Sequence, residues 1–237
     1  MNELEITPPS AFAATAAGAE RVTAFLRKVY GWMFVGLGLT GAVAVGVASS
    51  PTLVQTIFSN RILFFGLILA ELGMVFYLSA RVDKLAPATA SAVFLVYSAL
   101  NGATLSFIFL AYTGASIATT FFVAAGMFGA LALYGTTTKR SLAGVGQFVF
   151  MGLIGVILAS VVGLFWHNAA LQFAISVVGV IVFTGLTAWD AQRLKAMALA
   201  VPEGRVGSYA VVGALSLYLD FINLFLFLLR FLGNRRS

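Results

Sequence analysis

The chain has 237 residues, of which 61% are hydrophobic and only 9% are charged, and its net charge is +6. A soluble domain needs about 25% charged residues to cover its surface, so a soluble globular protein is excluded. The absence of cysteine and the single histidine exclude disulfides, thiolate metal sites and histidine-rich metal centres. The basic residues stand between apolar segments, where positive charge sets membrane orientation, so we expect the lipid bilayer and not nucleic acid as partner.

Residues 1–20 are small, polar and partly acidic, with a proline pair at Pro8 and Pro9. They lack the basic segment, apolar stretch and cleavage site of a secretory signal. We therefore expect a flexible cytoplasmic tail over residues 1–20 and a single transmembrane domain over residues 21–237.

The rest of the chain contains seven apolar segments, and about 20 apolar residues are enough to cross about 30 Å of hydrocarbon. These segments are 28–49, 61–80, 88–111, 116–134, 145–166, 170–190 and 208–231. The polar breaks between them are short, so neighbouring helices are antiparallel. The sequence predicts an all-α membrane protein, a bundle of seven transmembrane helices.

Lysine and arginine are unevenly divided between the two sides of this bundle. Ten of them fall on one side: Arg21, Arg27, Lys28, Arg81, Lys84, Lys139, Arg140, Arg193, Lys195 and Arg205. The opposite loops hold only Arg61, so the positive-inside rule predicts a cytoplasmic N-terminus. The basic tail, with Arg230, Arg235 and Arg236, lies outside if the last segment spans and inside if it is re-entrant. Charge late in the chain has less influence on topology, which favours seven spans.

Small residues four apart predict close helix packing. Ser98 and Gly102 form one such pair, Ala125 and Gly129 another, and a longer stripe runs from Gly155 to Gly163. Small side chains let helix backbones approach closely, although glycine is also common in membrane helices in general.

Three acidic residues lie inside the apolar segments: Glu71 in the second, Asp190 near the cytoplasmic end of the sixth and Asp220 midway along the seventh. A charge at the centre of a span costs about 2.5–3.5 kcal/mol on insertion scales, and such residues usually mark an ion or proton path. They are the candidate functional residues.

Asp190 and Asp220 are equidistant from the break around Arg205, so an antiparallel hairpin places them at the same depth. Ser216, Asp220 and Asn223 share one helical stripe, and Thr184, Thr187 and Asp190 share another. Polar stripes on apolar helices point inward, so the two aspartates can face one another.

Two carboxylates in contact at low dielectric cannot both ionise cheaply, and they tend to share a proton. Sharing the proton ties the two helices together, and losing it pushes them apart. Arg81 lies at a depth similar to that of Asp190 and is a candidate counter-ion.

Each of these residues also has a simpler interpretation. Asp220 and Glu71 can be neutral, hydrogen-bonded structural groups. Asp190 can extend to water at the membrane edge. Arg81 can be an ordinary positive-inside anchor.

Residues 214–230, ALSLYLDFINLFLFLLR, closely resemble the C-terminal signature of the Bax inhibitor-1 family, also called the transmembrane Bax inhibitor motif family. Residues 184–194, TGLTAWDAQRL, resemble the sixth-helix motif of that family. Residues 29–33 and 125–140 are similar to its bacterial inner-membrane members, and the resemblance extends over nearly the whole chain from Arg21.

The resemblance implies a seven-helix fold with the last helix near the centre, in a bacterial inner membrane. It implies a pH-sensitive calcium leak channel gated by an aspartate pair that matches Asp190 and Asp220. Glu71 matches an acid of the ion pathway, and Arg81 matches the arginine that pairs with the aspartates.

The leading hypothesis is therefore a passive channel with calcium as the permeant ion and no tightly bound cofactor. Calcium prefers oxygen ligands, and Asp190, Asp220 and Glu71 are the intramembrane carboxylates available for weak, transient binding. The alternative is a non-conducting regulator that binds another membrane protein, such as a protease or a cell-death factor. An intramembrane aspartyl protease is disfavoured, because Leu217-Tyr218-Leu219 precedes Asp220 where that class has Gly-x-Gly and no Pro-Ala-Leu segment follows. We expect no enzymatic activity.

Overall fold

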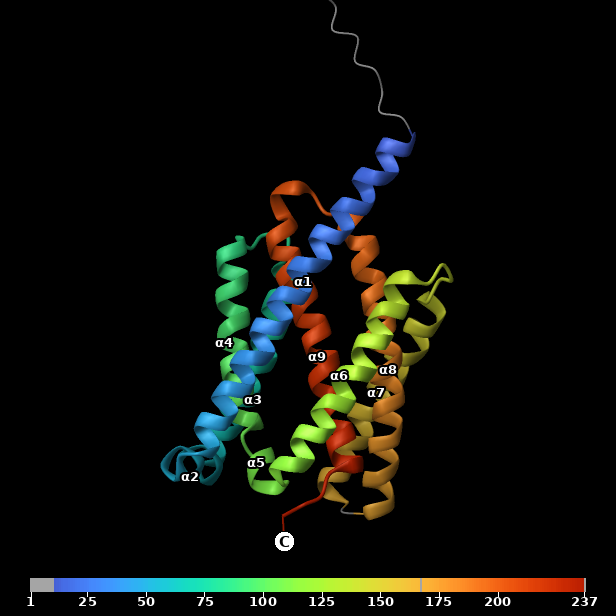
Figure 1. Ribbon diagram of the computed structural model, residues 1–237. Helices are drawn as coiled ribbons and strands as arrows, with labels where there is room; N and C mark the ends of the chain where they lie inside the picture. Colours follow the sequence, from blue (N-terminus) through green and yellow to red (C-terminus); the bar gives the residue numbers. More distant parts are fainter. Residues whose placement is uncertain (1–10, 167, 237) are drawn as a thin grey trace, which may run out of the picture.

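The computed structural model describes residues 11–166 and 168–236, and these residues are almost entirely helical (Figure 1). The elements in chain order are α1 (Ala11–Ala48), α2 (Pro51–Ser59), α3 (Arg61–Arg81), α4 (Pro87–Leu105), α5 (Ile108–Ala111), α6 (Gly114–Thr137), α7 (Ala143–Phe165), α8 (Ala169–Ala200), the 3-10 helix η1 (Glu203–Arg205) and α9 (Val206–Leu232).

Within the described residues, seven helical segments are long and apolar enough to cross a membrane. They are α1, α3, α4 together with α5, α6, α7, α8 and α9. The predicted all-α membrane bundle is thus confirmed, and each predicted segment falls within or close to one of these helices.

Two helices differ from the sequence prediction. The short helix α2 follows the first span, where a loop was expected; Ser50 caps it by accepting a hydrogen bond from the Leu53 amide, and Pro51 takes its first position. The sixth span, α8, continues to Ala200 instead of ending near residue 190. Residues 191–200 are mostly strong helix formers such as alanine, leucine and methionine, and Pro202 disfavours further helix.

The first helix begins at Ala11, inside the segment that was expected to be a flexible tail. Residues 11–20 are therefore an extension of α1, and residues 1–10 lie outside the described residues. In Figure 1 this extension projects beyond the rest of the bundle.

The bundle has two ends, named here by the terminus near each. The N-terminal end holds the start of α1, the break between α8 and α9, and the loop between α6 and α7. The C-terminal end holds α2, α5, the start of α8 and the end of α9 (Figure 1).

Helix α9 has the largest buried share among these spans. Of its most apolar 18-residue window 67% is buried, compared with 6% for α3. It packs against α1, α3, α4, α6 and α8, and Figure 1 shows it between α4 and α8.

Only some of the small-residue motifs mark close helix contacts. A Cβ added to Gly102 would lie 2.6 Å from the Thr40 carbonyl oxygen, so α4 and α1 touch backbone to backbone here. Gly135 approaches the Ala188 backbone in the same way. Gly129 and Gly155, by contrast, have no described atom within 4 Å of such a Cβ, so these two positions do not support the packing that was predicted for them.

Candidate functional site

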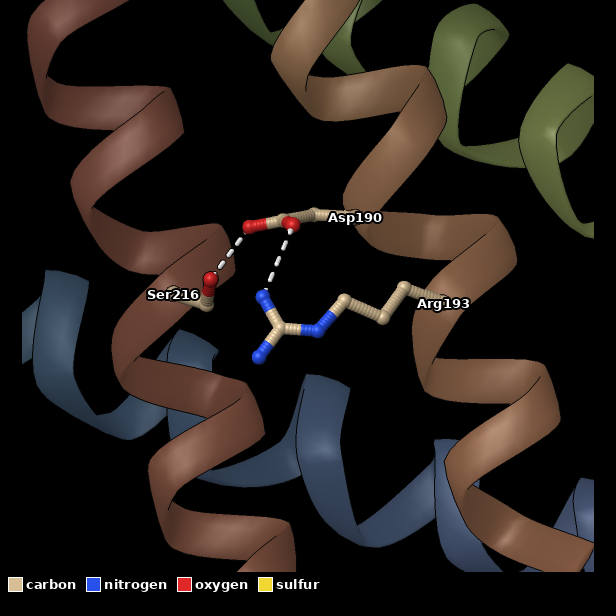
Figure 2. Close-up of polar contacts among 3 residues, drawn as sticks. All are labelled: Asp190, Arg193 and Ser216. Carbon is tan, nitrogen blue, oxygen red and sulfur yellow. Dashed lines mark hydrogen bonds and ion pairs between the residues drawn. The ribbon is translucent and has the colours of Figure 1, made fainter. Parts of the chain in front are cut away.

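Asp190 is a buried carboxylate on α8, with 6% of its surface exposed. The Ser216 hydroxyl of α9 donates a hydrogen bond to its Oδ2 atom. Arg193 Nη1 lies 3.7 Å from Oδ1, one turn further along α8. Figure 2 shows the carboxylate between the two partners, so Asp190 joins α8 to α9.

The structure differs from the sequence analysis in the surroundings of Asp190. The expected counter-ion, Arg81, is exposed at the end of α3, and Arg193 forms the ion pair. The guanidinium of Arg193 also lies 5.6 Å from the centre of the Trp189 ring, and its side chain is 55% exposed. Since α8 continues to Ala200, Asp190 lies within the helix and not at its end.

Asp220 is a second buried carboxylate, on α9, with 5% of its surface exposed. It lies one turn from Ser216 on the same helix, and α8 and α9 pack against each other. Among the described residues, its Oδ2 atom has no hydrogen-bond partner, and neither has Asp190 Oδ1. The contact that the structure shows between the two helices at this point is Asp190 with Ser216; it shows no hydrogen bond joining the two aspartates.

Two other polar residues of the two stripes, Thr187 and Asn223, bond to their own helices. Thr187 is fully buried and donates to the Phe183 carbonyl at 2.8 Å. Asn223 donates to the Leu219 carbonyl, also at 2.8 Å. Of Ser216, Thr187 and Asn223, only Ser216 therefore makes a hydrogen bond from its side chain to another helix in the described structure.

A cavity of about 260 Å³ lies beside Asp190, between α3, α8 and α9. Its polar lining comes from Asp190, Arg193, Ser216, Ser79 and Tyr209. One water takes up about 30 Å³ of liquid volume, so the cavity has room for several. Asp190 therefore borders a polar space that is large enough for water.

Glu71 belongs to a different polar cluster, between α3 and α4. Its Oε1 accepts a hydrogen bond from the Thr104 hydroxyl at 2.9 Å. Its Oε2 accepts one from the Asn101 amide at 3.2 Å. The half-buried carboxylate is thus held by two buried donors of one helix.

This cluster continues through α9 to α1. Asn101 Oδ1 lies 2.9 Å from the hydroxyl of Tyr218, which is fully buried, and that hydroxyl lies 2.7 Å from the Thr40 hydroxyl. Thr40 in turn is 2.8 Å from the Ser98 carbonyl oxygen, to which it can donate. Tyr218 and Thr40 have one hydroxyl proton each for these three contacts, so one hydrogen bond in the chain forms only when another is given up.

The three intramembrane carboxylates do not form one metal site. No group of three or more histidine, cysteine, aspartate or glutamate residues that could hold a metal ion occurs in the part of the chain that the structure describes. The structure groups Asp190 with Ser216 and Arg193, and groups Glu71 with Asn101 and Thr104.

Sequence reasoning missed Arg193, Asn101 and Tyr218. Arg193 is three residues from Asp190, a spacing that lets helical neighbours pair, so the signal was present. Asn101 and Thr104 have the same spacing and are polar residues inside an apolar span. Nothing in the sequence singled out Tyr218, because its hydrogen-bond partners, Thr40 and Asn101, lie on other helices.

Comparison with known proteins places the chain in a family. Residues 22–237 match the family model described as inhibitor of apoptosis-promoting Bax1. The inner membrane protein YbhL of Escherichia coli (strain K12) is 52% identical over 215 residues, which cover 90% of this chain and 92% of YbhL. A protein of Borreliella burgdorferi is 45% identical over 215 residues (90% of this chain, 93% of the relative), and one of Rickettsia prowazekii is 44% identical over 221 residues (92% of each). The chain belongs to the Bax inhibitor-1 family of membrane proteins.

Proposed function

We propose that this protein is a pH-sensitive, calcium-permeable leak channel of the bacterial inner membrane, gated by protonation of Asp190 and Asp220. The observation that carries the proposal is the pair of buried carboxylates on two helices in contact, α8 and α9. Each has an oxygen without a hydrogen-bond partner among the described residues.

A buried carboxylate oxygen without a partner makes the helix contact sensitive to protonation. Burying an unpaired charge is costly, and Asp220 has neither an ion pair nor a hydrogen bond to its buried oxygen in the described residues. Loss of the Asp220 proton places a negative charge on α9, the helix that faces Asp190. In a medium of low dielectric, this repulsion weakens the contact between α8 and α9.

The proposed ion path uses oxygen ligands in succession. Calcium binds carboxylate, carbonyl and water oxygens. The cavity beside Asp190 supplies carboxylate and hydroxyl oxygens from α8 and α9, and Glu71 supplies a carboxylate from α3. Because the carboxylates are separate, each calcium contact is weak and transient, as passive leakage requires. The proposal includes no catalytic step and no tightly bound cofactor.

The proposal places the protein in the inner membrane with its N-terminus in the cytoplasm. The name of YbhL is that of an inner membrane protein, which supports the same location for this chain. The excess of lysine and arginine at the N-terminal end of the bundle supports a cytoplasmic N-terminus.

A second candidate function is a non-conducting regulator that binds another membrane protein. Two observations favour it. The family description names an inhibitor of a protein, and α3 presents large apolar side chains such as Ile62 and Phe76, which are 87% and 71% exposed. A helix so little covered by its own bundle could contact a partner helix in the membrane.

Calcium flux into dye-loaded proteoliposomes between about pH 6 and pH 8 tests the channel proposal, because gating by coupled carboxylates must depend on pH. We expect pH-dependent flux from the wild type and flux without pH dependence from Asp220→Asn and Asp190→Asn. Glu20→Gln is the matched control, since it removes one acid from an exposed position on α1. If the folded wild type gives no more flux than empty liposomes, the channel proposal is wrong and the result favours a non-conducting regulator.

A further inference from the structure

A second polar cavity lies at the C-terminal end of the bundle, where Arg230 is ten residues along α9 from Asp220. Its volume is about 520 Å³, and it lies between the start of α8 and the end of α9 with the tail that follows. Arg230, Arg235 and Gln172 form part of its polar wall, and Phe173 and Phe231 form part of its apolar wall.

Arg230 is held in this cavity by a contact between helices. Its Nη1 atom donates a hydrogen bond of 3.0 Å to Gln172 Oε1, which joins α9 to α8. A guanidinium has five N–H donors in a planar fork, and the side chain is exposed. Most of its donors therefore remain available to a ligand.

Arg235 is positioned by its backbone. The Thr113 amide donates to the Asn234 carbonyl at 3.2 Å, and the Arg236 amide donates to the Ala111 carbonyl at 3.0 Å. These two bonds form an antiparallel bridge between Tyr112 and Arg235. The tail after α9 is thus attached to the turn before α6, and this attachment brings Arg235 to the wall of the cavity.

The electrostatic environment at this end favours an anion. Residues 49–60, 112–113, 166–168 and 233–237, which connect or follow the helices here, contain no aspartate or glutamate. Neither Arg230 nor Arg235 takes part in an ion pair among the described residues. The start of α8, at Asn168 and Ala169, also lines the cavity and adds the positive end of a long helix dipole.

We propose that this cavity binds the phosphate group of an anionic phospholipid between Arg230 and Arg235. Guanidinium groups match phosphate oxygens in a bidentate geometry. Phe173 and Phe231, with ring centroids 5.6 Å apart, are 60% and 48% exposed, and they form an apolar surface that an acyl chain can follow. The ends of the spanning helices lie at the level of the lipid headgroups, where such phosphates are present.

This site gives the basic tail a role. The positive-inside rule leaves Arg230 and Arg235 unexplained, because they stand at the end opposite most of the basic residues. An anionic headgroup compensates their charge and links the end of α9 to the start of α8.

Native mass spectrometry of the detergent-purified protein, titrated with phosphatidylglycerol, tests the proposal. We expect the wild type to retain phosphatidylglycerol in preference to phosphatidylcholine of the same acyl chains. Arg230→Gln with Arg235→Gln should weaken phosphatidylglycerol binding by about 10- to 100-fold, the loss that charge-assisted hydrogen bonds imply. Arg235→Gln alone should give a smaller loss and leaves the bond between Arg230 and Gln172 intact.

Arg236→Gln is the matched control, because it removes a neighbouring arginine that does not line the cavity; it should bind like the wild type. Equal loss in Arg236→Gln, or equal retention of both lipids by the wild type, contradicts the site. Inorganic phosphate added alone distinguishes the two sources of the anion. If it displaces the lipid at equal concentration, a free phosphate and not a lipid headgroup is the ligand, and the lipid assignment is wrong. Unchanged melting temperatures of the unliganded variants verify that they are folded.

Discussion

The hydroxyl of Ser216 donates a hydrogen bond to the carboxylate of Asp190, and this bond joins α9 to α8 one turn from Asp220. Ser216 thus links the two buried aspartates, because it bonds to Asp190 and shares a helical stripe with Asp220. Ser216 therefore belongs to the candidate site together with the two aspartates.

Replacing Ser216 by alanine should destabilise the protein by about 1–3 kcal/mol, because a buried acceptor on Asp190 loses its partner. Thermal unfolding in detergent measures the change. Ser49→Ala is the control: Ser49 is exposed and its hydroxyl bonds only to the Val45 carbonyl of its own helix. Equal stability of the two variants would show that the bond between α8 and α9 contributes little.

Arg193→Gln should change the pH dependence of calcium flux more than it changes stability. The ion pair with Asp190 is partly exposed, and exposed pairs contribute about 0.2–1 kcal/mol. The charge of Arg193 nevertheless faces the carboxylate that is proposed to gate. Arg81→Gln discriminates between the two arginines, and a larger effect from Arg81 would restore the role that the sequence suggested for it.

Glu71→Gln should be tolerated, whereas Glu71→Ala should be destabilising by about 1–3 kcal/mol. A glutamine can accept from Asn101 and donate to the Thr104 hydroxyl, since that hydroxyl also lies 3.0 Å from the Asn101 carbonyl and can donate there instead. Unfolding of both variants checks the prediction. Calcium flux through Glu71→Gln then shows whether ion passage needs the negative charge, because the hydrogen bonds to Asn101 and Thr104 are retained.

Tyr218→Phe should be destabilising by about 1–3 kcal/mol, because Asn101 and Thr40 both lose a hydrogen-bonding partner in the core. The ring packing against Phe94 and Tyr97, with edge-to-face centroid distances of 5.8 Å and 5.7 Å, remains. Tyr77→Phe serves as comparison, since Tyr77 is 41% exposed. A loss no larger than in Tyr77→Phe would show that water replaces the missing hydroxyl.

Gly102→Ala should be destabilising by about 1–3 kcal/mol, the usual cost of forcing an extra methyl group into a packed contact. The new Cβ would meet the backbone of Thr40 on α1, which cannot move as a flexible side chain does. Gly129→Ala makes the same chemical change where the described structure leaves open space, and it should be neutral in the same unfolding assay.

The sequence alone predicted the number and order of the spanning helices. Length and apolarity suffice for this, because the bilayer demands about 20 apolar residues per span and leaves each backbone hydrogen-bonded within its own helix. Symmetry about the break at Arg205 also predicted that Asp190 and Asp220 lie at similar depth, whereas the structure joins Asp190 to Ser216, one turn from Asp220. The family signature in residues 214–230 pointed to the family that the comparisons then showed.

Only the tertiary structure decided which side chains meet. Helices that are apolar on nearly every face carry little information about their rotation, so the sequence could not show that Asp190 meets Ser216 or that Tyr218 meets Asn101. The expectation for Arg81 rested on depth alone, whereas Arg193 lies three residues from Asp190 on the same helix and was readable from that spacing. The attachment of Arg235 to the turn before α6 joins segments more than a hundred residues apart, and the folded bundle alone brings them together.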